Sequence, residues 1–195
     1  TDLLTPAWDF SGRLWMVDRN EGAAVVSYLR RGRPHEIDVP NISGQDVKSF
    51  LVSRDGSRFV AVIRGDGADQ VVVSRLLQSD QGRVEEALPA RQVGVDEGLG
   101  LRIKDIAWLT PTSIVVLHPV EDLLFQVRTA SVDGAPGGAD DLSLTLEGRI
   151  LGLAGTPTPG QSTYALTRNS LIDLSGPSAG ATETEPGITS LGYVG

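Results

Sequence analysis

Short apolar runs bounded by glycine, proline, aspartate and serine recur along the whole chain. Runs such as Phe59-Val-Ala-Val-Ile63 have the length and the β-branched content of strands. No long stretch carries the 3.6-residue spacing of an amphipathic helix. The pattern therefore predicts an all-β fold.

One pattern recurs along the chain: an apolar strand, a short polar turn and a second apolar strand. Its copies begin near residues 4, 48, 104 and 149. The spacings are 44, 56 and 45 residues, and a four-stranded propeller blade requires roughly 40–50. In the first two copies the turns contain Gly12 and Gly56, which suit β-hairpins.

Each copy leaves room for two more strands, so the repeat predicts a β-propeller of about four four-stranded blades. The additional strands are expected at Ala23–Leu29 and His35–Val39, Gln70–Leu77 and Ala87–Val93, Leu123–Ser131 and Leu142–Leu146, and Ser170–Leu174 and Ala181–Glu185. The blades then cover about residues 4–40, 47–93, 103–147 and 149–185 of a single domain, 1–195. A β-sandwich with accidental spacing is the alternative.

A lone strand is expected at Thr189–Val194, matching the first strand of another blade. Propeller rings are commonly closed by one blade built from both ends of the chain. The other strands of this blade would then lie before Thr1. We therefore expect an open arc that is part of a larger propeller, with exposed ends that are prone to pair with a second copy.

Trp8 and Trp108 occupy the place in the repeat that Val52 occupies in the second copy. Equivalent places in a repeat should meet equivalent surroundings. We therefore predict that both rings are buried between adjacent sheets, and we favour this over a role in stacking on a ligand.

The composition and motifs argue against most catalytic chemistry. The chain has no cysteine and a net charge of -8, which disfavours thiolate chemistry and binding to nucleic acid phosphates. Its two histidines, His35 and His118, fall at different places in the repeat and lack metal-ligand spacing. No phosphate loop or Gly-x-Ser-x-Gly motif is present. We therefore predict no catalytic residue, no bound metal and no cofactor.

Distant carboxylates can still meet in a propeller, so an enzyme acting on cell-wall glycans or peptides stays an alternative, as does a small-ligand receptor. The residues that would discriminate are Asp9, Asp18, Asp55, Asp105 and Glu121. Their convergence on one face would favour an enzyme, and their scattering would favour a binding module.

A basic run, Arg30-Arg31-Gly32-Arg33, stands out in this acidic chain. It is either a hairpin tip kept soluble by charge or an arginine hot spot for an acidic partner surface. We identify Arg30, Arg31 and Arg33 as the candidate partner-binding residues.

Three segments together resemble the propeller region of actinobacterial LpqB-type lipoproteins. They are Leu4-Thr-Pro-Ala-Trp-Asp-Phe-Ser-Gly-Arg-Leu-Trp-Met-Val-Asp18, Phe50-Leu-Val-Ser-Arg-Asp-Gly-Ser-Arg-Phe-Val-Ala-Val-Ile63 and Ile103-Lys-Asp-Ile-Ala-Trp-Leu109. The ending Leu191–Gly195 also looks like that family's C-terminus.

The resemblance implies a secreted, non-enzymatic module on the extracytoplasmic face of the cell membrane. In that family a lipidated cysteine upstream anchors the protein, and this chain contains no such cysteine. The implied partner is the extracytoplasmic domain of an MtrB-type sensor histidine kinase, in signalling that maintains the cell envelope. The family offers no catalytic residues to carry over.

Overall fold

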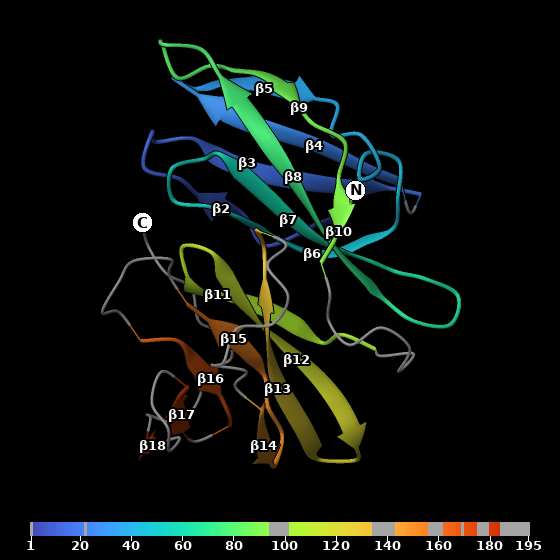
Figure 1. The fold of residues 1–195 in the computed structure, drawn as a ribbon, viewed down its shortest axis with the longest axis vertical. Helices are drawn as coiled ribbons and strands as arrows, with labels where there is room; N and C mark the ends of the chain where they lie inside the picture. The colour runs from blue at the N-terminus through green and yellow to red at the C-terminus, as the bar shows by residue number, and fades with distance from the viewer. Residues whose placement is uncertain are drawn as a thin grey trace. The chain divides into compact units, whose positions relative to one another are not determined.

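The computed structural model describes residues 2–21, 23–93, 102–133, 143–155, 162–168, 170–174 and 180–183. The regular structure of these residues consists of β-strands (Figure 1), so the predicted all-β fold is confirmed. In these ranges no helix could span a membrane. The chain divides into two compact units, Thr1–Val93 and Gly94–Val194, and each is described by itself.

The first unit contains two antiparallel sheets. The first sheet consists of β1 (Asp2–Leu3), β2 (Ala7–Trp8), β3 (Leu14–Asn20), β4 (Ala23–Arg30) and β5 (Arg33–Ile37), in which β1 and β2 both pair with β3. The second sheet consists of β6 (Val47–Val52), β7 (Arg58–Ile63), β8 (Gln70–Gln78), β9 (Val84–Ala87) and β10 (Arg91–Gln92), in which β9 and β10 both pair with β8.

The second unit contains two antiparallel sheets of four strands, each paired in chain order. The third sheet consists of β11 (Asp105–Thr110), β12 (Ser113–Glu121), β13 (Leu124–Ser131) and β14 (Ser143–Glu147). The fourth consists of β15 (Gly152–Ala154), β16 (Tyr164–Leu166), β17 (Ser170–Asp173) and β18 (Gly180–Glu183). The strand expected at 189–194 lies outside the described residues, so that strand and the open arc stay predictions.

The last strand predicted for the second copy differs in the structure. The run predicted as one strand, Ala87–Val93, forms the end of β9 and, after an interruption, β10. Pro89 lies in the interruption and has no N–H to donate to a sheet ladder. Leu88 N donates to Arg75 O at 2.8 Å, so the chain stays on the edge of β8 while it passes the proline.

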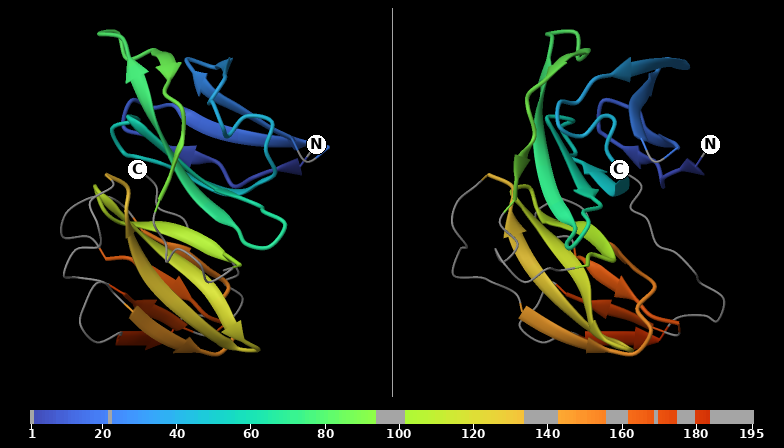
Figure 2. Two further views of the ribbon diagram at one scale, coloured as in Figure 1. Left: turned by 45° about the vertical axis from the view of Figure 1, so that its right-hand side comes forward. Right: turned by 90° about the vertical axis from the view of Figure 1, so that its right-hand side faces the viewer.

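Aromatic side chains form the centre of the first unit's core, between its two sheets. Trp15 on β3 has its ring centroid 5.0 Å from that of Tyr28 on β4 and 6.0 Å from that of Phe59 on β7. Phe50 stacks on Phe59 at 5.3 Å. The two sheets lie side by side in both views of Figure 2. Alternate residues of the strands supply this core, as the period of two in a pleated strand requires.

The prediction that Trp8 is buried was wrong, whereas Trp108 is buried as predicted. Trp8 is 52% exposed and Trp108 is 3% exposed. Trp8 pairs with Leu14, whereas Ala7 pairs with Trp15. Directly paired residues share one face of a sheet, so Trp8 lies on the face opposite to Trp15 and points away from the core with the second sheet.

The two tryptophans near the first turn are therefore expected to differ in their effect on stability. Trp15→Ala should lower the free energy of unfolding by about 3–5 kcal/mol, because it removes a fully buried ring. Trp8→Ala should cost less than about 1 kcal/mol, because half of that side chain remains in water. Urea unfolding followed by circular dichroism measures both, and equal losses would contradict the assignment of faces.

Candidate functional site

The candidate arginines lie at a tight hairpin between β4 and β5. Arg30 pairs with Arg33, so the loop between the strands consists of Arg31 and Gly32 alone. Both have positive φ, 51° at Arg31 and 73° at Gly32. These signs define a type I′ turn, whose twist matches the strands and which favours Asn-Gly. Arginine at its first position is unfavourable, because its Cβ crowds the backbone there.

Arg30, Arg31, Arg33 and His35 line a cavity of about 430 Å³, which we call the arginine pocket. Arg30 Nη2 donates to Gln81 O in the β8–β9 loop, which links the hairpin to the second sheet. The His35 ring stacks on Tyr28 with centroids 5.2 Å apart. Among the described residues, no carboxylate forms an ion pair with the three arginines. The pocket is thus a concave cationic surface on an acidic chain.

Another arginine, Arg13, stabilises the first unit through contacts that were not predicted from the sequence. The side chains of Arg13 and Asp9 are fully buried, and Arg13 Nε lies 2.6 Å from Asp9 Oδ2. Trp15 Nε1 donates to the same oxygen at 2.8 Å. Arg13 Nη1 also donates to Gly82 O at 2.9 Å, and Nη2 donates to Gln78 Oε1 at 3.1 Å. The pair therefore ties the β2–β3 turn to the β8–β9 hairpin.

Gly12 and Gly56 lie at the turns that the sequence assigned to them. Their φ angles are 72° and 67°. The positions differ in their surroundings. A Cβ on Gly12 would meet no atom within 4 Å, whereas a Cβ on Gly56 would overlap the Arg13 guanidinium and lie 2.7 Å from Asp9 Oδ2. Position 56 thus requires glycine for two reasons, its positive φ and the close approach of the Asp9–Arg13 ion pair, whereas position 12 favours glycine for its positive φ alone.

Two further candidate carboxylates, those of Asp55 and Asp105, accept hydrogen bonds from groups within their own units. Burial raises the pKa of Asp55, but hydrogen bonds from Ser53 and Ser57 outweigh it, so this pKa lies below its ordinary value. Burial raises the pKa of Asp105, although the N–H groups of Leu153 and Ile106 donate to it at 2.7 and 2.9 Å. Both carboxylates, like Asp9, stabilise local structure.

Among the residues that the structure describes, Asp18 and Glu121 make no contact that suggests catalysis. Asp18 lies on β3 of the first unit with one buried oxygen lacking a hydrogen bond, and Glu121 is exposed at the end of β12 in the second unit. The five candidate carboxylates are divided between the units, so the test of their convergence stays open. Within the described residues, no three histidine, aspartate or glutamate side chains are grouped as metal ligands.

The histidines have different surroundings. His35 is half-buried at the arginine pocket, whereas His118 is 3% exposed on β12. Neither ring nitrogen of His118 has a hydrogen-bond partner in the part of the chain that the structure describes. They lie in separate units, so each is described within its own unit.

In each of the four sheets, four strands pair in chain order: β2–β5, β6–β9, β11–β14 and β15–β18. Successive sheets of this kind define the β-propeller class. A family model described as the lipoprotein LpqB beta-propeller domain matches residues 1–144. The chain therefore belongs to the LpqB propeller family, and the expected resemblance is confirmed.

Two curated relatives support this membership. Lipoprotein LpqB of Streptomyces avermitilis is 25% identical over 146 residues, which are 73% of this chain and 24% of the relative. Lipoprotein LpqB of Streptomyces coelicolor is 25% identical over 138 residues, which are 69% of this chain and 22% of the relative. The chain thus spans about a quarter of the length of these lipoproteins.

A solved structure supports the fold. A chain in the crystal structure of a nidogen/laminin complex matches with a TM-score of 0.58 and 14% identity, over 89% of this chain and 60% of that one. At this identity the likeness concerns the fold alone.

Proposed function

We propose that this chain is a non-enzymatic protein-interaction module of an LpqB lipoprotein on the extracytoplasmic face of the cell membrane. Its partner is the extracytoplasmic domain of an MtrB-type sensor histidine kinase, whose signalling in envelope homeostasis it modulates. The arginine pocket is the observation that carries the proposal. Arginine is enriched at the energetic centres of protein interfaces, because its planar guanidinium binds carboxylates in a bidentate geometry.

The conformation of Arg31 supports a binding role for the hairpin. A non-glycine residue at positive φ costs roughly 1–2 kcal/mol, and asparagine or glycine would fit this turn better. A charged side chain that persists in such a place is consistent with use of the side chain itself. The charge contrast adds to this, since three arginines gather on a chain whose net charge is -8.

The carboxylates support the non-enzymatic part of the proposal. Asp9 is held by Arg13 and Trp15, and Asp105 accepts two backbone N–H groups. A general acid or base must reach a substrate proton, and these carboxylates are directed to structural donors instead.

The test is the affinity of the Arg30→Glu/Arg31→Glu/Arg33→Glu variant for the purified kinase domain. We expect binding about tenfold weaker or more, because a cationic contact becomes repulsive. The fold should persist, since Arg31 and Arg33 are exposed and the half-buried Arg30 loses only one hydrogen bond, to Gln81 O. Biolayer interferometry at two salt concentrations measures the affinity and its electrostatic part.

A matched control carries the same charge change elsewhere. Arg75, Arg149 and Arg168 are exposed and do not line the pocket, so their triple glutamate variant should keep affinity within about twofold. Arg31→Asn should stabilise the turn by about 0.5–1 kcal/mol while it weakens binding. Unchanged affinity in the pocket variant, with circular dichroism intact, would remove this site.

A further inference from the structure

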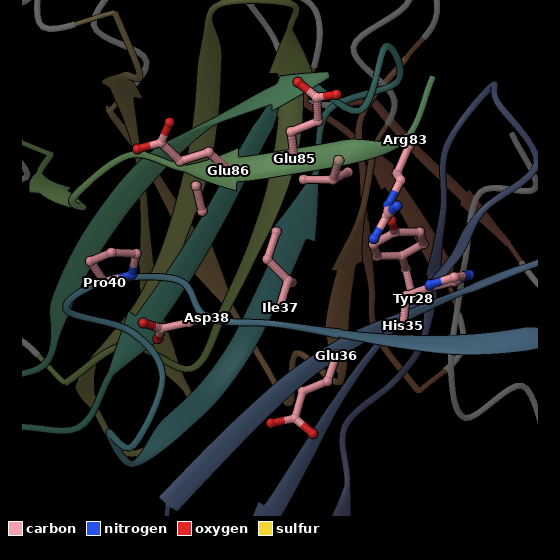
Figure 3. Close-up of a pocket in the computed structure, with 11 residues that line it drawn as sticks. Tyr28, His35, Glu36, Ile37, Asp38, Pro40, Arg83, Glu85 and Glu86 are labelled. Atoms are coloured by element: carbon pink, nitrogen blue, oxygen red, sulfur yellow. The ribbon is translucent and has the colours of Figure 1, made fainter. Parts of the chain in front are cut away.

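A groove of about 410 Å³ lies between β5 and β9, next to the arginine pocket (Figure 3). The two strands belong to different sheets of the first unit. Within the described residues, β5 pairs only with β4 and β9 pairs only with β8. Each strand therefore presents one unpaired edge.

Hydrogen bonds fix the groove at both ends. At one end Ala90 N donates to Pro40 O at 3.1 Å, and Asn41 Nδ2 donates to Ala90 O at 3.3 Å. At the other end Arg30 donates to Gln81 O. Because these bonds join the two sheets across the groove, its shape is set by the fold of the unit.

The groove combines an apolar centre with a charged rim. Buried Tyr28, Val84 and Ala87 line it, and the side chain of Ile37 points between the strands (Figure 3). The carboxylates of Glu85 and Glu86 stand on the outer side of β9. Such a distribution is typical of a protein-binding surface.

The charges of the rim differ from one end to the other. Four carboxylates line the groove: Glu36, Asp38, Glu85 and Glu86. None of them forms an ion pair with a described residue. Arg83 lies at the opposite end and extends toward Tyr28 and His35 (Figure 3), where the arginine pocket begins. Glu85 and Glu86 rise from β9 on the side away from β5, and Glu36 rises from β5 on the side away from β9 (Figure 3), so these carboxylates border the groove. A ligand in the groove therefore meets their negative charge where it crosses the edges of the strands, and it meets the positive charge of Arg83 at the other end.

We infer that this groove binds an extended segment of a partner protein, with lysine or arginine over the carboxylates and an acidic residue over Arg83. The lining residues of the groove follow one another along both strands, from 35 to 38 on one side and from 83 to 87 on the other, so an extended segment can run alongside them. Pro34 directly precedes the groove and has no N–H to donate, so an added strand could not continue along β5 past His35.

The inference rests on the proposed function only in assigning the segment to the same partner. Labelled hexapeptides test it without the kinase. Two of them have the charges in blocks: Lys-Lys-Val-Val-Glu-Glu and Glu-Glu-Val-Val-Lys-Lys. In a third isomer of identical composition the charges alternate. We expect one block isomer to bind the intact chain about tenfold tighter than the alternating isomer, measured by fluorescence anisotropy.

Glu85→Lys/Glu86→Lys should abolish this preference, since both side chains are exposed and line the groove. Glu121→Lys/Asp122→Lys makes the same charge change at an exposed site in the second unit and should leave it intact. Equal binding of the isomers, or a preference that survives Glu85→Lys/Glu86→Lys, overturns the inference. Failure of the proposed function would instead appear as unchanged kinase affinity in the arginine variant.

Discussion

Asp9→Ala should lower the free energy of unfolding by about 3–5 kcal/mol, because it leaves Arg13 as an uncompensated buried charge. Both side chains are fully shielded from water, and Asp9 also accepts the Trp15 indole N–H. Two backbone N–H groups, those of Ser11 and Arg13, lose their acceptor as well. Chemical denaturation followed by circular dichroism measures the loss.

Two control variants separate the buried charge from a general effect of losing aspartate. Asp2→Ala disrupts an ion pair with Arg19 in which the Asp2 side chain is 64% exposed, and it should cost less than about 1 kcal/mol. Asp9→Ala/Arg13→Met removes both charges and should recover at least about 1 kcal/mol relative to Asp9→Ala. A loss under 1 kcal/mol for Asp9→Ala, or no recovery in the double variant, would mean that an uncompensated Arg13 charge does not govern the loss of stability.

Gly56→Ala should be nearly as damaging, at about 3–4 kcal/mol. About 1–2 kcal/mol comes from the positive φ, and the rest comes from overlap with the Arg13 guanidinium. That guanidinium cannot move away easily, because it is held by Asp9, Gln78 and Gly82. Thermal and urea unfolding of the purified variant measure the loss.

Gly12→Ala is the matched comparison, since its φ is similar but its Cβ would lie in open space. It should cost only the conformational strain, about 1–2 kcal/mol. If both glycine variants lose the same free energy, the contact with the ion pair does not explain the need for glycine at Gly56.

Both predictions concern a cluster whose partners are far apart in the sequence. Asp9 and Arg13 are separated by four residues, but the carbonyl of Gly82 and the side chain of Gln78 come from the second sheet. Asp9 and Arg13 therefore link the first sheet to the second. The spacing of Asp9 and Arg13 around one turn was the available signal.

The sequence by itself determined the strands and the hairpins. Strand formation and two-residue turns depend on alternation and on local conformational preferences, which neighbouring residues carry. The predicted strand over Ala23–Leu29 is β4 with one added residue, and the glycines at both early turns have the expected positive φ. The arginine run was likewise placed at a hairpin tip by its flanking strands.

Tertiary structure decided which face of each strand is covered and which distant groups meet. Trp8 and Trp15 are both apolar and near one turn, so composition cannot choose between them; the register with β3 and the packing of the second sheet bury Trp15 alone. The buried ion pair and the groove between β5 and β9 also arise only where two sheets approach. Such contacts depend on packing between segments remote in the chain, which strand periodicity does not encode.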